Sequence, residues 1–148
     1  MKFGHYLAPV GPIRAQDFRL RNPMGGWITD AGRDEAFRSF QFMGAVSRHM
    51  AVGCAITKTH HYMSAFAYAW FKGKFTQLRL GSRVGDTAEF ADDPDNGRTE
   101  LKTGRGNVAM QSDGNTKQLT VNSTTLNIEL KFSDESTEIL RLCTPAGP

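Results

Sequence analysis

Apolar and polar residues alternate along much of this chain with the two-residue period of a β-strand. The alternation is plainest from Leu126 to Phe132, where every second side chain is apolar and Asn127, Glu129 and Lys131 stand between. This pattern is typical of a half-buried strand in an antiparallel sheet. No segment longer than two turns shows a convincing helical period. The pattern therefore predicts an all-β, antiparallel and mostly meandering fold.

We expect short strands joined by turns. The expected strands cover residues 39–46, 48–57, 60–71 and 75–80, the segments around 108–110, 119–121 and 126–132, and finally 138–143. The expected turns and loops lie at 72–74, 86–98, 112–115, 122–123 and 133–135. The loop at 86–98 ends in Asn96-Gly97, which is a strong turn pair. The glycines of the run Gly104-Arg105-Gly106 are interpreted as a bend or bulge in a strand.

The segment 60–71, HHYMSAFAYAWF, has two unlike faces when it is read as a strand. Its aromatic face carries Tyr62, Phe66, Tyr68 and Trp70, and its other face is largely alanine. We expect both faces to be covered, with the alanine face against a close layer or a cavity. In order of preference, the aromatic face packs in the core, lines an apolar ligand cavity or stacks nucleic-acid bases.

The chain has 148 residues, which fits one domain. We expect residues 1–36, which are rich in proline and glycine turns, to form an irregular segment packed on a β-barrel domain at 37–148. No apolar run is long enough to span a bilayer, and the start does not have the pattern of a secretory signal. Cys54 and Cys143 are then expected to be reduced thiols of a cytoplasmic protein, with a disulfide as the alternative.

The run from Phe40 to Phe71, FQFMGAVSRHMAVGCAITKTHHYMSAFAYAWF, resembles a bacterial family of unknown function, as do LKF at 130–132 and LRLCTPAG at 140–147. The chain departs from the family pattern at Met43, where an aromatic residue is usual. The family is related to AttH-type proteins and carotenoid 1,2-hydratases, which consist of two lipocalin-like barrels.

The resemblance implies a lipocalin-like (calycin-type) barrel or strongly curved sheet, with this chain as the first half of a double barrel. The second half, or a homo-oligomer, would then cover an unpaired sheet edge. The resemblance carries no catalytic residues over to this chain.

The net charge of +3 hides an asymmetry. Residues 1–84 hold twelve Lys or Arg against four Asp or Glu, and residues 85–148 hold six against eleven. This division indicates either a basic binding face or an attraction between the two halves of the fold, and we prefer the attraction.

Few residues carry a signal for chemistry. His60 and His61 are adjacent on a predicted strand and so point to opposite faces, which disfavours a shared metal. The run from Asp92 to Gly97 resembles half a calcium loop but lacks its final acidic ligand, so an acidic turn is expected. Cys54 lies in an apolar strand, where a thiol is inert. We predict neither a metal nor a cofactor.

We expect the chain to bind a hydrophobic small molecule, lipid-like or isoprenoid-like, inside the barrel. The walls would include the alanine face of 60–71 and the apolar face of 126–132. The candidate ligand-binding residues are Arg48, His61, Tyr62, Tyr68 and Trp70.

The first alternative is a hydratase-like enzyme acting on an isoprenoid or acyl chain. It requires an acid in the interior, and Glu100, Glu129 and Glu138 are the carboxylates in or near predicted strands. The second alternative is a single-stranded nucleic-acid-binding β-barrel, which the acidic second half disfavours.

Overall fold

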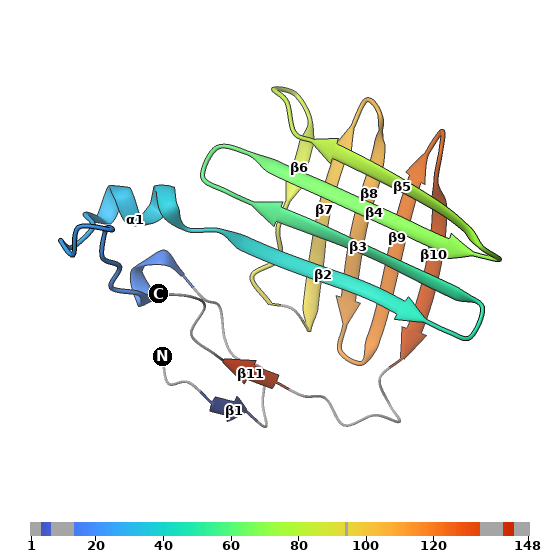
Figure 1. Ribbon diagram of the computed structural model, residues 1–148, viewed down its shortest axis with the longest axis horizontal. Coiled ribbons are helices and arrows are strands. Elements are labelled where there is room, and N and C mark those ends of the chain that lie inside the picture. The colour runs from blue at the N-terminus through green and yellow to red at the C-terminus, as the bar shows by residue number, and fades with distance from the viewer. Residues whose placement is uncertain (1–3, 7–13, 94, 134–140, 144–148) are drawn as a thin grey trace.

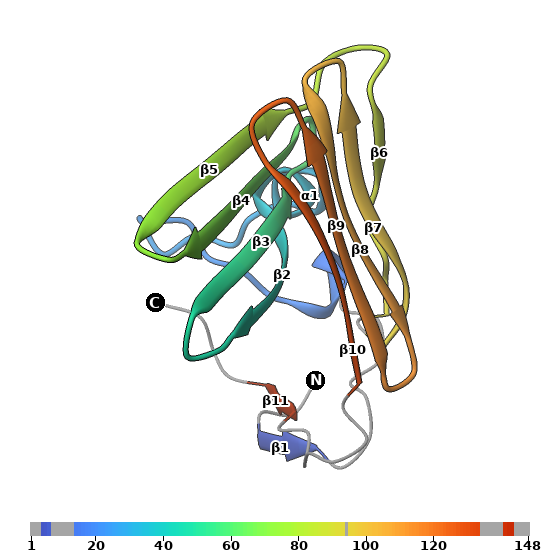
Figure 2. The ribbon, with the colours of Figure 1, turned by 90° about the vertical axis from the view of Figure 1, so that its right-hand side faces the viewer.

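Two antiparallel β-sheets lie face to face in the computed structural model, which describes residues 4–6, 14–93, 95–133 and 141–143 (Figures 1 and 2). The first sheet is formed, in order, by β2 (Ser39–Val46), β3 (Met50–Lys58), β4 (Met63–Phe71) and β5 (Lys74–Gly81). The second is formed by β10 (Asn127–Ser133), β9 (Thr116–Ser123), β8 (Gly106–Asp113), β7 (Asn96–Thr103) and β6 (Thr87–Glu89). Within each of these two sheets, strands that are neighbours in sequence pair with each other, so the predicted all-β antiparallel and mostly meandering fold is confirmed.

Neither sheet closes on itself, and the strands of one sheet cross those of the other (Figure 1). The edges of the sheets are β2 and β5 in the first, and β6 and β10 in the second. A small third sheet pairs β1 (Gly4–Tyr6) with β11 (Arg141–Cys143). That a second half or a second copy covers an edge stays a prediction.

The segment before β2 contains local structure. A 3-10 turn, η1 (Ala15–Asp17), is followed by the helix α1 (Asp30–Ala36). Thr29 caps this helix, because its hydroxyl oxygen accepts a hydrogen bond from the backbone N–H of Gly32 at 3.2 Å. No helix among the described residues is long and apolar enough to cross a membrane.

The core lies between the two large sheets. It takes the inner faces of β3 and β4, with Cys54, Ile56 and Ala67 fully buried, and the facing side chains of the second sheet, such as Leu101 and Leu119. The alanines of β4 leave room for the second sheet to approach closely. The alanine face and the apolar face of β10 do border one interior, as expected, but packed side chains fill it.

The aromatic face of β4 is not covered, and on this point the expectation for 60–71 was wrong. Phe66 and Trp70 are each 40% exposed on the outer side of the first sheet. The alanine side of the strand is the buried one, with Ala65 and Ala67 at 5% and 0%.

The turns differ from the prediction in three places. Residues 86–98 are not one loop, since they include β6 and the start of β7. Asn96 and Gly97 form no turn but pair with Asp113 and Ser112 in the ladder of β7 and β8. Gly104 lies in the tight hairpin turn between these strands and not in a bulge. The turn expected at 133–135 and most of the strand expected at 138–143 fall outside the described residues.

Candidate functional site

The outer face of the first sheet carries large apolar side chains in an ordered array. Its cross-strand rows can be read from the register of β2, β3, β4 and β5. The rows are Phe40, Thr57, Ser64 and Gly81; Phe42, Ala55, Phe66 and Arg79; Gly44, Gly53, Tyr68 and Gln77; and Val46, Ala51, Trp70 and Phe75. We call this array the aromatic face. Figure 2 shows the first sheet edge-on, with this side turned away from the second sheet.

Small residues of β3 form the floor of the aromatic face. The ring of Tyr68 lies over Gly53, where an added Cβ would stand only 2.8 Å from the tyrosine oxygen. Ala55 is 1% exposed between Phe42 and Phe66, its neighbours in the register. The Tyr68 ring therefore leans over the central strand and is half-buried, whereas Phe42, Phe66, Trp70 and Phe75 are exposed to solvent.

A groove of about 490 Å³ follows β4 and β5 on this face. Tyr62 closes one end of it, with its ring over Gly81. Tyr68 and Phe75 lie further along, with ring centroids 6.1 Å apart and planes inclined by 24°. The outer-face side chains that line the groove are those of Tyr62, Ser64, Phe66, Tyr68, Phe75, Gln77 and Arg79. The site is open and shallow, and its walls are mostly rings.

Arg79 is the cation of the groove. It stands beside Phe66 in the register, and its side chain is exposed. Among the ion pairs of the described residues, none involves Arg79. Arg98, on the second sheet, is instead bound to Glu100 at 2.8 Å, and this contact holds the pKa of Glu100 below its ordinary value. Arg79 thus keeps its guanidinium available for an anionic partner.

Carboxylates are absent from the whole first sheet. Between Glu35 and Asp86 the chain contains no Asp or Glu, but it contains the cations Arg38, Arg48, Lys58, Lys72, Lys74, Arg79 and Arg83. Arg48, Lys72 and Lys74 lie at one end of the sheet, and Arg38, Lys58 and Arg83 at the other. Cations therefore stand at both ends of the first sheet, and Arg79, in the same row as Phe66, is the strand cation whose position is on the aromatic face.

The structure separates the predicted site residues into two groups. Tyr62 and Tyr68 line the groove, and Trp70 shares their face next to Phe75. Arg48 lies in the turn after β2 and His61 in the turn after β3, at opposite ends of the sheet. Neither of these two lines the groove.

Sequence reasoning missed Phe75, Gln77 and Arg79, all of which come from β5. A signal for them was present in the short link at Lys72 and Gly73. Both have positive φ, 49° and 80°, as in the two-residue hairpin turn that fixes strand register. That register places the three side chains opposite Trp70, Tyr68 and Phe66.

Metal and thiol chemistry find no support among the described residues. They contain no group of three or more His, Cys, Asp or Glu that could hold a metal ion. His60 and His61 lie in a turn, not on a strand as expected. Their rings are arranged edge to face, with the ring centroids 4.3 Å apart. Cys54 is free, and burial raises its pKa to about 12, which keeps the thiol protonated and inert.

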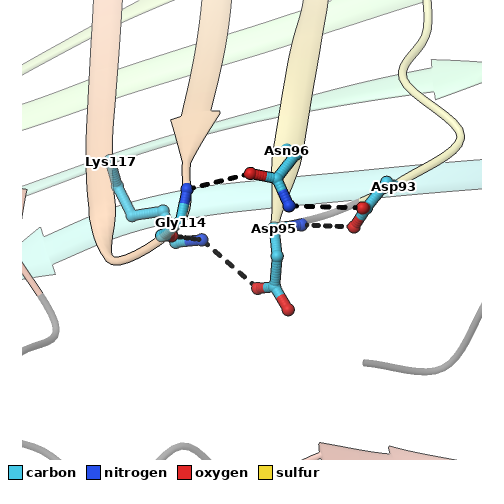
Figure 3. A network of polar contacts seen from close by, with 5 residues as sticks. All are labelled: Asp93, Asp95, Asn96, Gly114 and Lys117. Carbon is cyan, nitrogen blue, oxygen red and sulfur yellow. Dashed lines mark hydrogen bonds and ion pairs between the residues drawn. The ribbon is translucent and has the colours of Figure 1, made fainter. Parts of the chain in front are cut away.

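The acidic run before β7 forms a structural network (Figure 3). The backbone N–H of Asp95 donates to the Asp93 carboxylate at 2.8 Å, which lowers the pKa of Asp93. Asn96 accepts from the backbone N–H of Gly114 at 3.1 Å, and the Lys117 ammonium contacts Asp95 at 3.3 Å. The Asp95 carboxylate and the Asn96 amide thus tie the start of β7 to the hairpin of β8 and β9, through an ion pair and a hydrogen bond.

Comparison of the chain with protein-family models, curated proteins and solved structures finds no match.

Proposed function

We propose that this protein is a binding protein whose ligand lies on the aromatic face and combines apolar or ring surface with negative charge. The observation that supports this proposal is a face of exposed rings on a sheet that has cations and no carboxylate. Large apolar side chains gathered on a surface are costly to leave in water and commonly mark an interaction site. The cations around them select the sign of the partner.

The location that we propose for the ligand differs from the one expected from the sequence. A hydrophobic molecule was expected inside a barrel, but the space between the sheets is filled by residues such as Ile56, Leu101 and Met110, each exposed by 1% or less. The groove lies outside, on β4 and β5. An apolar ligand with an anionic group could rest its apolar part on Tyr68 and Phe75 and bind Arg79 through its charge.

The hydratase alternative has no comparable support. It requires an acid in the interior, and the buried polar residues of the described core are Thr99 and Ser112. Glu100 and Glu129 share a row on the outer side of the second sheet. The side chain of Glu138 lies outside the described residues.

Two fluorescent probes of similar shape test the proposal. Anilinonaphthalene sulfonate carries a negative charge, and phenylnaphthylamine does not. We expect the anionic probe to bind more tightly, with energy transfer from the tryptophans. Tyr68→Ala should lower the affinity for both probes. Arg79→Gln should lower the affinity for the anionic probe alone, by roughly tenfold.

Lys131→Gln is the matched control, because Lys131 lies on the outer side of β10 in the second sheet and is exposed. It should leave both affinities unchanged. Equal binding of the two probes, or binding that neither Tyr68→Ala nor Arg79→Gln alters, would contradict the proposal.

A further inference from the structure

We infer that the anionic ligand of the aromatic face is single-stranded nucleic acid, with bases stacked on the rings and phosphates held by the surrounding cations. This inference rests on the proposed function, since it names the class of ligand for the same face. It depends on how the rings and the cations are distributed.

The rings are spread along and across the sheet and do not line one enclosed pocket. Phe66, Tyr68 and Trp70 occupy every second position of β4, so their positions are roughly 6.7 Å apart along the strand. Phe75 stands beside Trp70, and Phe42 lies beyond Ala55 on the far side of β3. A compact molecule would use one or two of these rings. A chain of repeated flat groups can use them all.

The cations are spread in the same way. Arg79 lies on the edge strand β5, between the two ends of the face, and other cations stand at those ends, among them Lys72 at one and Arg38 at the other. A ligand with a single carboxylate needs one cation. Cations at both ends and along one edge match a ligand that carries a negative charge on every repeat, as a phosphodiester chain does.

The acidic second half of the sequence no longer opposes this assignment. Its described carboxylates lie on the second sheet or its loops, and Glu100 and Glu129 are on the side that faces away from the first sheet. The carboxylate nearest to β5 along the chain is that of Asp86, beyond the end of the strand. The first sheet is thus free of carboxylates, and those of the second half lie on or beside the second sheet.

The form of the face favours single strands over duplexes. Aromatic side chains stack on bases only where the bases are unpaired and splayed, and a sheet presents them as a flat platform. No helix or narrow ribbon of the kind that enters a major groove stands out from this face of the described sheet (Figures 1 and 2).

Fluorescence anisotropy of the full chain with labelled oligo(dT), about twelve nucleotides long, tests the inference. We expect binding at low salt, with log K falling linearly against log salt, and weaker binding of a duplex of the same length. Tyr68→Ala should lower the affinity roughly 5- to 100-fold without changing the salt slope. Arg79→Gln should lower the affinity and reduce the magnitude of the slope by roughly 0.7.

Two further variants keep the result interpretable. Phe75→Ala removes a second ring of the groove and should act as Tyr68→Ala does, and circular dichroism should show the strand content of both variants unchanged. Lys131→Gln should alter neither affinity nor slope. Equal weakening by Lys131→Gln and Arg79→Gln would mean non-specific attraction and would overturn the inference.

The remaining outcomes separate this inference from the proposed function. If oligo(dT) fails to bind while the anionic probe binds at Tyr68 and Arg79, the inference is wrong and the proposed function is still supported. If neither binds, both fall. Sedimentation with anionic phosphatidylserine vesicles is the third arm, and binding to vesicles without binding to oligo(dT) would assign the face to a membrane surface.

Discussion

Gly53 and Gly81 lack a side chain, and a tyrosine ring occupies the space above each of them. At Gly53 an added Cβ would come within 2.8 Å to 2.9 Å of three atoms of Tyr68. Glycine in a strand is normally a weakness, because it adds no packing and costs conformational entropy. Here a tyrosine ring packs over each glycine, so each glycine and its tyrosine have to be considered as a pair.

The first prediction concerns this pair. Gly53→Ala should lower the free energy of unfolding by about 1–3 kcal/mol, because the new methyl group forces the Tyr68 ring away. In a Tyr68→Ala background the same change should instead stabilise by about 0.5 kcal/mol, because the clash is gone and the entropy cost of glycine remains. Urea denaturation of the four proteins measures this difference. Equal effects of Gly53→Ala in the two backgrounds would show that the ring does not lie over the glycine.

The second prediction concerns Cys54, whose pKa burial raises from 9.0 to about 12. Above pH 9 the unfolded chain releases the thiol proton while the folded chain keeps it, so stability must fall as pH rises. From pH 8 to pH 10 the parent protein should lose about 1 kcal/mol more unfolding free energy than Cys54→Ala does. Denaturation at a series of pH values measures the two slopes. Parallel slopes would mean that the thiol titrates normally in the fold.

At the scale of elements, one polar bridge joins the two sheets inside the core. Thr99 of β7 is 0% exposed, and its hydroxyl contacts the side-chain oxygen of Gln41 on β2. The same hydroxyl accepts a hydrogen bond from the backbone N–H of Ala91 at 3.0 Å. The buried Thr99 hydroxyl therefore links the edge strand β2 of the first sheet with the segment before β7.

The third prediction tests this bridge. Thr99→Val keeps the shape of the side chain but leaves the amide of Ala91 and the oxygen of Gln41 without this partner. We expect the free energy of unfolding to fall by about 1–3 kcal/mol. Thr120→Val is the control, because Thr120 lies on the outer side of the same sheet, and it should change stability by no more than about 0.5 kcal/mol. A loss at Thr99 no larger than at Thr120 would contradict the role of the bridge.

The strands themselves could largely be predicted from the sequence. β2 has the expected bounds, because an alternating apolar run stands between Arg38 and Ser47 and its pairing with β3 is local. The start of β7 could not be predicted. The Asn96-Gly97 pair is a local turn signal, but the side chain of Asn96 bonds to Gly114, 18 residues away, and the pair joins a ladder with β8. A contact of this range leaves no trace in a short window of sequence.

The site was predicted only in part, for a different reason. Periodicity correctly divided β4 into an aromatic and an alanine face, but both faces are apolar. Which one is buried depends on the other sheet, whose large side chains, including Leu101 and Leu119, fill the space that the alanines leave. The sequence of β4 alone therefore cannot show that Phe66 and Trp70 remain open to solvent.

For the whole molecule, the charge asymmetry of the sequence allowed two interpretations, a basic binding face and an attraction between the two halves of the fold. The ion pairs among the described residues join Asp30 with Arg33, Glu100 with Arg98, and Asp95 with Lys117. None of these connects residues 1–84 with residues 85–148. The contact between the large sheets is mainly apolar. Our proposed function uses the first interpretation, in which the cations of the first sheet are a feature of its surface.

The last prediction distinguishes the effect on ligand affinity of where a charge lies from the effect of the net charge of the protein. The double variant Lys72→Glu, Lys74→Glu changes one end of the first sheet, beside the aromatic face, and Lys102→Glu, Lys131→Glu makes the same change in net charge on the second sheet. If net charge governed ligand affinity, both double variants would lower the affinity for anilinonaphthalene sulfonate equally. Because the field near a charge is screened over about 10 Å at moderate salt, we expect the first double variant to lower this affinity several-fold more than the second. Titrations at two salt concentrations measure this difference, which should narrow as salt rises.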